Sequence, residues 1–117
     1  MSSPFVFAQR PVGFATTLSA NTATVVIDAT NAPVTVTDFE INEAGGGTQN
    51  LTVELYDGTN SRYLSDDAGT TWKAKAVTAY KGYKFTRVVV VDKGSKLRIT
   101  SSDASGNFHV VGNKLPN

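Results

Sequence analysis

Residues 50–56 read Asn-Leu-Thr-Val-Glu-Leu-Tyr and carry the clearest structural signal in the chain. Leu51, Val53 and Leu55 alternate with polar or amphipathic residues. Successive side chains of a β-strand point to opposite faces of the sheet, so this period of two is typical of a half-buried strand. The stretch therefore predicts a strand with one face in a core and the other face against water or a partner.

Two later stretches repeat this pattern. Residues 96–100 read Lys-Leu-Arg-Ile-Thr, and residues 107–111 read Asn-Phe-His-Val-Val. In each stretch every second residue is large and apolar, which indicates one buried face. The side chains predicted to face inward are Leu97, Ile99, Phe108 and Val110.

A change of parity marks residues 34–42. The apolar residues occupy even positions up to Val36 and odd positions from Phe39 to Ile41. One extra residue in a strand reverses the alternation, so a β-bulge near Thr37–Asp38 is predicted.

Three further stretches have weaker patterns. Residues 22–28 are rich in threonine and valine, and residues 85–91 end in four consecutive valines, which predicts burial on both faces. Residues 71–80 place Trp72 and two alanines, Ala74 and Ala76, on one face. We expect a strand there, with a short helix as the alternative.

Glycine-containing turns separate these stretches. Asp57–Gly58 predicts a tight hairpin because glycine readily adopts positive φ, and Lys93–Gly94 and Gly106–Asn107 predict the same. Such short strands and frequent turns indicate an all-β fold. We expect an antiparallel β-sandwich or small barrel, jelly-roll or immunoglobulin-like, with about seven to nine short strands. It would span residues 19–117, preceded by an N-terminal arm over residues 1–18.

The N-terminal segment contains three phenylalanines, two prolines and no clean alternation. Proline disfavours a central strand, so the segment is either an edge strand folded on its own core or an arm docked on a neighbour. Burying one phenylalanine is worth roughly 1.5–3 kcal/mol, so these rings need cover. In the arm reading, the residues that contact a partner are Phe5, Phe7, Arg10 and Phe14.

Length and composition fit a single domain. The chain has 117 residues and no cysteine, which excludes disulfides and thiolate metal sites. Its start lacks the basic region and long apolar run of a signal peptide. No stretch approaches the roughly 20 apolar residues of a membrane span. We therefore expect synthesis in a cytoplasm and no membrane partner.

No catalytic pattern is present. His109 is the only histidine, and no nucleophile motif accompanies it. The acidic residues at Asp57 and at Asp66–Asp67 do not follow a calcium-loop pattern and are explained by turn formation. Gly45–Gly47 lacks the Gly-Lys-Ser/Thr of a phosphate loop. We expect no enzyme, no cofactor and no metal site.

Charge is divided unevenly along the chain. Residues 1–67 carry two basic and eight acidic residues, a net −6, whereas residues 68–117 carry nine basic and two acidic residues, a net +7. If the halves mix in the fold, the surface is evenly charged. If they separate, the surface is bipolar and suits contacts between subunits.

Residues 73–98 contain eight basic residues, with Tyr80, Tyr83 and Phe85 interspersed among them. Such patches can bind single-stranded nucleic acid, but a net charge of +1 is too low for that class. We therefore expect an acidic protein surface as the partner and no nucleic acid. The predicted contact residues are Lys73, Lys75, Lys81 and Lys84.

The order of strands and turns resembles the small β-sandwich structural proteins of tailed bacteriophages over residues 22–112. In that pattern, a turn with glycine and polar residues leads into Leu, a basic residue, Ile or Val, and Thr, before a short final strand. The segments that carry the resemblance are Val34–Asn42, Leu51–Gly58, Tyr63–Leu64, Val90–Ser102 and Phe108–Val111.

The resemblance implies a virion protein of the head decoration or cement type. Such a protein binds the outer surface of the major capsid protein lattice and stabilises the head through multivalent, non-covalent contacts. It also implies self-association, with a homo-trimer favoured over a dimer, synthesis in the host cytoplasm and a place on the capsid exterior. No catalytic residue is carried over.

Two alternatives remain open from the sequence. The first is a tail, neck or fibre component of a virion. The second, of another class, is a carbohydrate-binding module that presents Trp72, Tyr80 and Tyr83 to sugar rings.

Overall fold

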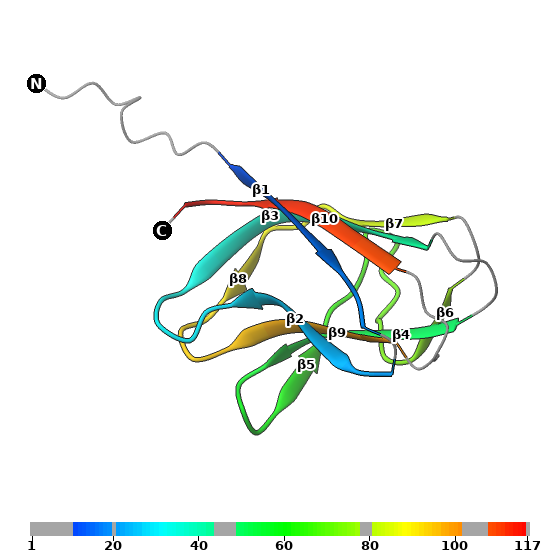
Figure 1. The fold of residues 1–117 in the computed structure, drawn as a ribbon, viewed down its shortest axis with the longest axis horizontal. Helices are drawn as coiled ribbons and strands as arrows, with labels where there is room; N and C mark the ends of the chain where they lie inside the picture. Colours follow the sequence, from blue (N-terminus) through cyan, green and yellow to red (C-terminus); the bar gives the residue numbers. More distant parts are fainter. Residues whose placement is uncertain (1–10, 20, 44–48, 78–80, 102–107, 117) are drawn as a thin grey trace, which may run out of the picture.

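The computed structural model describes residues 11–19, 21–43, 49–77, 81–101 and 108–116. Within these ranges the chain forms two antiparallel β-sheets packed face to face and no helix (Figure 1). The predicted all-β sandwich is confirmed. The strands are β1 (Val12–Thr17), β2 (Ala23–Asp28), β3 (Val34–Glu43), β4 (Gln49–Tyr56), β5 (Ser61–Tyr63), β6 (Lys75–Val77), β7 (Gly82–Phe85), β8 (Val89–Val91), β9 (Lys96–Ser101) and β10 (Phe108–Lys114).

Each sheet contains five strands. The first sheet has the order β1-β10-β3-β7, with β8 also paired to β3. The second sheet has the order β2-β9-β4-β5, with β6 also paired to β4. The chain crosses repeatedly between the sheets, so each sheet combines strands from both halves of the sequence.

β3 contains the bulge that its sequence predicts. The pairing with β10 skips Thr37, which has no opposite residue. The extra residue reverses the alternation, so Val36 and Phe39 are both buried. On the other side of β3 the neighbouring strand is interrupted, and β7 and β8 pair with separate parts of β3. This interruption and the short β5 and β6 bring the described strands to ten, above the seven to nine expected.

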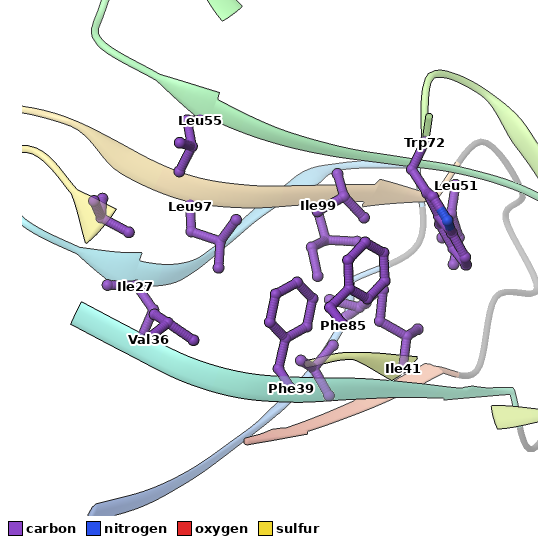
Figure 2. Packing of buried hydrophobic residues seen from close by; sticks show 14 of the residues in the cluster. Ile27, Val36, Phe39, Ile41, Leu51, Leu55, Trp72, Phe85, Leu97 and Ile99 are labelled. Atoms are coloured by element: carbon purple, nitrogen blue, oxygen red, sulfur yellow. The ribbon is translucent and has the colours of Figure 1, made fainter. Parts of the chain in front are cut away.

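The core lies between the two sheets (Figure 2). Phe39 and Phe85 stack with ring centroids 4.4 Å apart, and Trp72 meets Phe85 edge-on at 5.2 Å. The predicted inward side chains are all buried, which confirms the assigned alternation: Leu51, Val53, Leu55, Leu97, Ile99, Phe108 and Val110.

The four consecutive valines are not buried on both faces, contrary to the prediction. Val91 is buried, but Val88 is 64% exposed and Val90 is 48% exposed. β8 follows ordinary alternation because only one face of its sheet packs against the second sheet.

The strand predicted over residues 71–80 is much shorter. Only Lys75–Val77 forms a strand, β6. Trp72 is fully buried, whereas Ala74 is exposed and has a φ of 52°, so the two do not share the predicted common face. Residues 78–80 lie outside the described residues.

The predicted Asp57–Gly58 hairpin joins β4 and β5. Gly58 has a φ of 99°, in the region that favours glycine. The Asp57 carboxylate accepts hydrogen bonds from the backbone N–H groups of Asn60 at 2.7 Å and Thr59 at 2.9 Å. These bonds favour the charged form and lower the pKa of Asp57.

The other two predicted hairpins have different outcomes. Lys93–Gly94 does turn the chain, but it joins β8 and β9, which belong to different sheets. It is therefore a crossover between sheets, and the hairpin prediction is wrong there. Gly106–Asn107 lies outside the described residues.

The described part of the expected N-terminal arm belongs to the sandwich. β1 pairs with β10, Phe14 packs against the core, and Leu18 is buried. The edge-strand alternative holds for this part, so regular structure begins at Val12 rather than after residue 18. Phe5, Phe7 and Arg10 lie outside the described residues.

Candidate protein-interaction surface

Three of the four predicted contact lysines lie over aromatic rings. Lys75 Nζ lies 5.1 Å from the centre of the Tyr83 ring, and Lys81 Nζ lies 5.5 Å from the same centre. An ammonium group at this distance is attracted by the negative face of the ring. We call Trp72, Lys75, Lys81 and Tyr83 the lysine–tyrosine cluster; Lys73 belongs to a separate group described below.

The lysine–tyrosine cluster joins the two sheets. Lys75 lies on β6 of the second sheet, and Tyr83 lies on β7 of the first. Trp72 bridges them from the interior: its ring meets Tyr83 edge-on at 5.0 Å and lies 5.2 Å from Lys75 Nζ. The positive charges therefore rest on a packed aromatic base.

Asp66 fixes the position of Trp72. Its Oδ2 accepts a 2.9 Å hydrogen bond from Trp72 Nε1, and its Oδ1 accepts 3.0 Å bonds from the backbone N–H groups of Ala68 and Thr70. Burial raises the pKa of Asp66, but these bonds and the Lys75 charge outweigh burial, so the pKa is lowered overall. The ionised carboxylate thus anchors both the turn and the indole.

The next residue ties the same turn to the first sheet. The Asp67 carboxylate accepts hydrogen bonds from the Thr86 backbone N–H at 2.7 Å and from the Thr86 hydroxyl at 2.9 Å. Thr86 directly follows β7, which carries Tyr83. Adjacent aspartates therefore hold the tryptophan and the tyrosine strand in fixed relation.

A second group lies on the outer face of the second sheet. Lys73 Nζ lies 5.2 Å from the centre of the Tyr63 ring, and Tyr63 lies opposite Glu54. Arg98 Nε donates a 2.8 Å hydrogen bond to Glu54 Oε1, and Arg98 Nη2 contacts the same oxygen. The guanidinium also lies 3.7 Å from the centre of the Tyr56 ring. We call these five residues the arginine–tyrosine row.

Sequence reasoning missed Tyr56, Tyr63 and Arg98 as members of one surface. A signal was present, since the alternation that turns Leu55 and Leu97 inward also turns Tyr56 and Arg98 outward. The register of β4 against β5 and β9 brings them together, and this long-range pairing is not readable from the separate strands.

Lys84 belongs to neither group. It lies on β7 opposite Glu40, beside a shallow groove of about 690 Å³ on the outer face of the first sheet. Gly13, Ala15 and Val111 also line this groove. The four predicted lysines therefore occupy three places on the molecule.

The two oppositely charged halves of the sequence mix in the fold. Arg98 pairs with Glu54, and Arg62 Nη2 lies 4.0 Å from Asp92 Oδ2. Each pair joins one residue from the acidic half to one from the basic half. The halves of the sequence therefore do not form separate faces, and the evenly charged alternative describes the surface better.

The sugar-binding alternative fails on Trp72. Its side chain is fully buried, so it cannot stack on a sugar ring at the surface. Tyr83 is half-buried beneath two lysines, and Tyr80 lies outside the described residues.

The described ranges contain no group of three or more His, Cys, Asp or Glu side chains that could hold a metal ion. His109 Nδ1 lies 3.2 Å from the Thr17 hydroxyl. In the same ranges no helix has the length and apolar character to cross a membrane.

Comparisons with known proteins give only distant likenesses. No family model and no curated protein matches the sequence. PirA is 13% identical with a TM-score of 0.48, over 86% of this chain and 92% of PirA. A chain of the cyanophage Pam1 capsid asymmetric unit is 16% identical with a TM-score of 0.41, over 92% of this chain and 81% of that chain. A chain of infectious bursal disease virus, Gx strain, is 16% identical with a TM-score of 0.39, and the match spans 29% of its length. At these identities and scores the likenesses carry no argument about function.

Proposed function

We propose that this chain is a structural protein of a virion, a decoration protein that binds the outer surface of the major capsid protein lattice. It acts by adhesion and has no catalytic role. The observation that supports this proposal most is the pair of rigid basic and aromatic groups: the lysine–tyrosine cluster and the arginine–tyrosine row. The sequence resemblance to small β-sandwich phage proteins supports it independently.

The chemistry of these groups fits an acidic protein partner. Aromatic residues and arginine are enriched at the energetically important centres of protein interfaces. Glu54 and Asp66 are buried beneath their partners, whereas Lys73 and Lys81 are exposed. What the surface offers to a partner is therefore positive charge beside tyrosine rings.

Weak contacts suffice for this role because the partner is repeated. One exposed ion pair between a lysine of this chain and an acidic residue of the partner contributes roughly 0–1 kcal/mol. Copies that are linked to one another bind a lattice at many points, which raises the overall affinity without any new contact. Self-association is therefore part of the proposed function.

The test is particle occupancy of a charge-removing variant. In Lys75→Gln/Lys81→Gln we expect occupancy at a fixed concentration to fall about tenfold, since each tenfold change in affinity corresponds to about 1.4 kcal/mol. Wild-type attachment should also weaken as salt rises, because exposed charges are screened beyond about 8 Å at physiological ionic strength.

The matched control removes the same charge elsewhere. Arg87 and Lys93 are exposed and lie outside both groups. Arg87→Gln/Lys93→Gln should therefore keep wild-type occupancy. Equal losses in the two double variants, or attachment that is indifferent to salt, would show that the lysine–tyrosine cluster is not the contact.

A further inference from the structure

β1 is an open edge of the first sheet. Among the described strands it pairs only with β10, through a regular register from Val12 opposite Lys114 to Thr17 opposite His109. One side of its backbone is therefore paired and the other faces away from the sheet.

The unpaired groups belong to Gly13, Ala15 and Thr17. Leu18 N–H donates a 3.0 Å hydrogen bond to the Phe108 carbonyl, which continues the β1–β10 register. In an antiparallel pair, the residues that exchange hydrogen bonds alternate with residues that face away. The backbone N–H of Leu18 points toward β10, so the backbone N–H and C=O groups of the even-numbered residues of β1 also point toward β10. Those of the odd-numbered residues point away from it. Gly13, Ala15 and Thr17 are also exposed.

Nothing in β1 protects this edge. Natural edge strands are shielded by lysine, proline, bulges or very short length. β1 reads Val-Gly-Phe-Ala-Thr-Thr over six residues, with no charge, no proline and no shift in register. The other described edge strands differ: β2 carries a register shift between Val25 and Ile27, β7 has only four residues including a lysine, and β5, β6 and β8 have three residues each.

We propose that β1 pairs with β1 of a second copy of this chain across a two-fold axis at Ala15. In this antiparallel register Ala15 lies opposite the partner's Ala15, and Gly13 lies opposite the partner's Thr17. The unpaired backbone N–H and C=O groups of Gly13, Ala15 and Thr17 in each copy then lie opposite the same unpaired groups of the other copy. The contact is self-complementary, as a two-fold interface requires.

The side chains suit this register. Gly13, Ala15 and Thr17 are small, and a Cβ at Gly13 would meet nothing closer than 3.9 Å, so the outer face of β1 is uncrowded at this position. On the inner face, Phe14 lies opposite the partner's Thr16. Val12, which is 46% exposed, lies opposite the partner's Leu18 and becomes covered. The first sheets of the two copies then form one continuous sheet.

The test combines molecular mass with amide hydrogen exchange on the isolated full chain. Sedimentation should give a concentration-dependent dimer. The amides of Gly13, Ala15 and Thr17 should exchange slowly in the dimer and quickly on dilution, whereas Phe14 and Thr16 stay slow in both. A chain that is monomeric or trimeric at all concentrations, or a dimer in which the three odd-numbered amides stay fast, overturns the proposal.

Charge variants at the axis provide a second readout. Ala15→Lys places two like charges opposite each other and should raise the dimer dissociation constant about fivefold or more, and Ala15→Glu should do the same. An equimolar mixture of the two variants should restore the dimer. Val111→Lys adds the same charge one strand inward and should leave the dimer intact. Failure of the mixture to recover, or equal loss in Val111→Lys, contradicts the register.

These measurements need no particle, so they separate this interface from the proposed attachment to a capsid. A chain that dimerises through β1 but does not bind particles would refute only the proposed function. A chain that binds particles as a monomer would refute the interface and the self-association included in the proposed function, but not the attachment to a capsid.

Discussion

Asp66 shows how much one side chain fixes in this protein. Its two oxygens hold a tight turn and the buried Trp72 indole, and Trp72 supports both Lys75 and Tyr83. The sequence explains Asp66 by turn formation alone, because nothing local indicates that the tryptophan six residues later folds back onto it. The residue that orders the candidate surface is therefore buried beneath it and is not one of its exposed charges.

We predict that Asp66→Ala destabilises the fold by about 2–4 kcal/mol at pH 7, because it leaves the buried Trp72 N–H and the turn amides without their acceptor. The pKa of Asp66 is lowered from 3.8 in the folded protein. Its contribution is therefore present above about pH 4 and is lost as pH falls further. Urea unfolding at pH 7 and pH 3 should show the gap between variant and wild type shrinking in acid.

Asp92→Ala is the control for this prediction. Asp92 is exposed and lies 4.0 Å from Arg62, a surface pair that contributes roughly 0–1 kcal/mol. A cost for Asp66→Ala no larger than that for Asp92→Ala would contradict the anchoring role of Asp66.

The burial of single side chains in the core gives a second prediction about individual residues. Leu97 is fully buried. Leu97→Ala should therefore destabilise by roughly 2–5 kcal/mol, the cost of lost burial and a cavity. Val90→Ala, at an exposed position, should change the unfolding free energy by about 0.5 kcal/mol or less. A Leu97→Ala cost below about 0.5 kcal/mol would mean that the assigned strand faces are reversed.

At the scale of the elements, sequence patterns predicted what depends on neighbours along the chain. The alternation in β4, β9 and β10, the hairpin at Asp57–Gly58 and the bulge at Thr37 are all local, and all were confirmed. The failures at Val88–Val91 and Lys93–Gly94 have one cause. Whether a strand meets a partner on both faces, or a turn returns to the same sheet, depends on the topology of the whole chain.

The close packing of β10 against β1 and β3 gives a prediction about how the strands fit together. A Cβ at Gly112 would lie 2.5 Å from the Asp38 carbonyl oxygen and 2.7 Å from Phe14 Cζ, so Gly112→Ala forces β1, β3 and β10 apart. We expect a loss of about 1–3 kcal/mol by urea unfolding. Gly13→Ala, where the space is open, should cost about 0.5 kcal/mol or less. Equal costs would mean that the three strands are not packed as closely as described.

At the scale of the whole molecule, topology decides what the surface offers. Because the sheets interleave the two halves of the sequence, acidic and basic residues that lie far apart along the chain become neighbours in pairs such as Glu54–Arg98. The lysine–tyrosine cluster gathers positive charge because Lys75 and Lys81 both lie over the Tyr83 ring. Spacing alone could not predict this, since Lys73 and Lys84 lie close to the cluster in sequence but elsewhere on the surface.

The N-terminal segment remains a proposed contact with a neighbour. Since β1 begins at Val12, deletion of residues 2–10 removes Phe5, Phe7 and Arg10 and leaves every described strand intact. We expect Tm to change little and particle occupancy to collapse. Unfolding of the truncated chain would instead assign these phenylalanines to the chain's own core.

The number of copies per particle tests the central claim most directly. Particles purified from cells that make this chain can be analysed by quantitative mass spectrometry against their major capsid protein. A decoration protein on a repeating lattice predicts on the order of hundreds of copies, in a fixed ratio to the capsid protein. A handful of copies would place the chain in a tail, neck or fibre, and absence from the particle would contradict a virion role altogether.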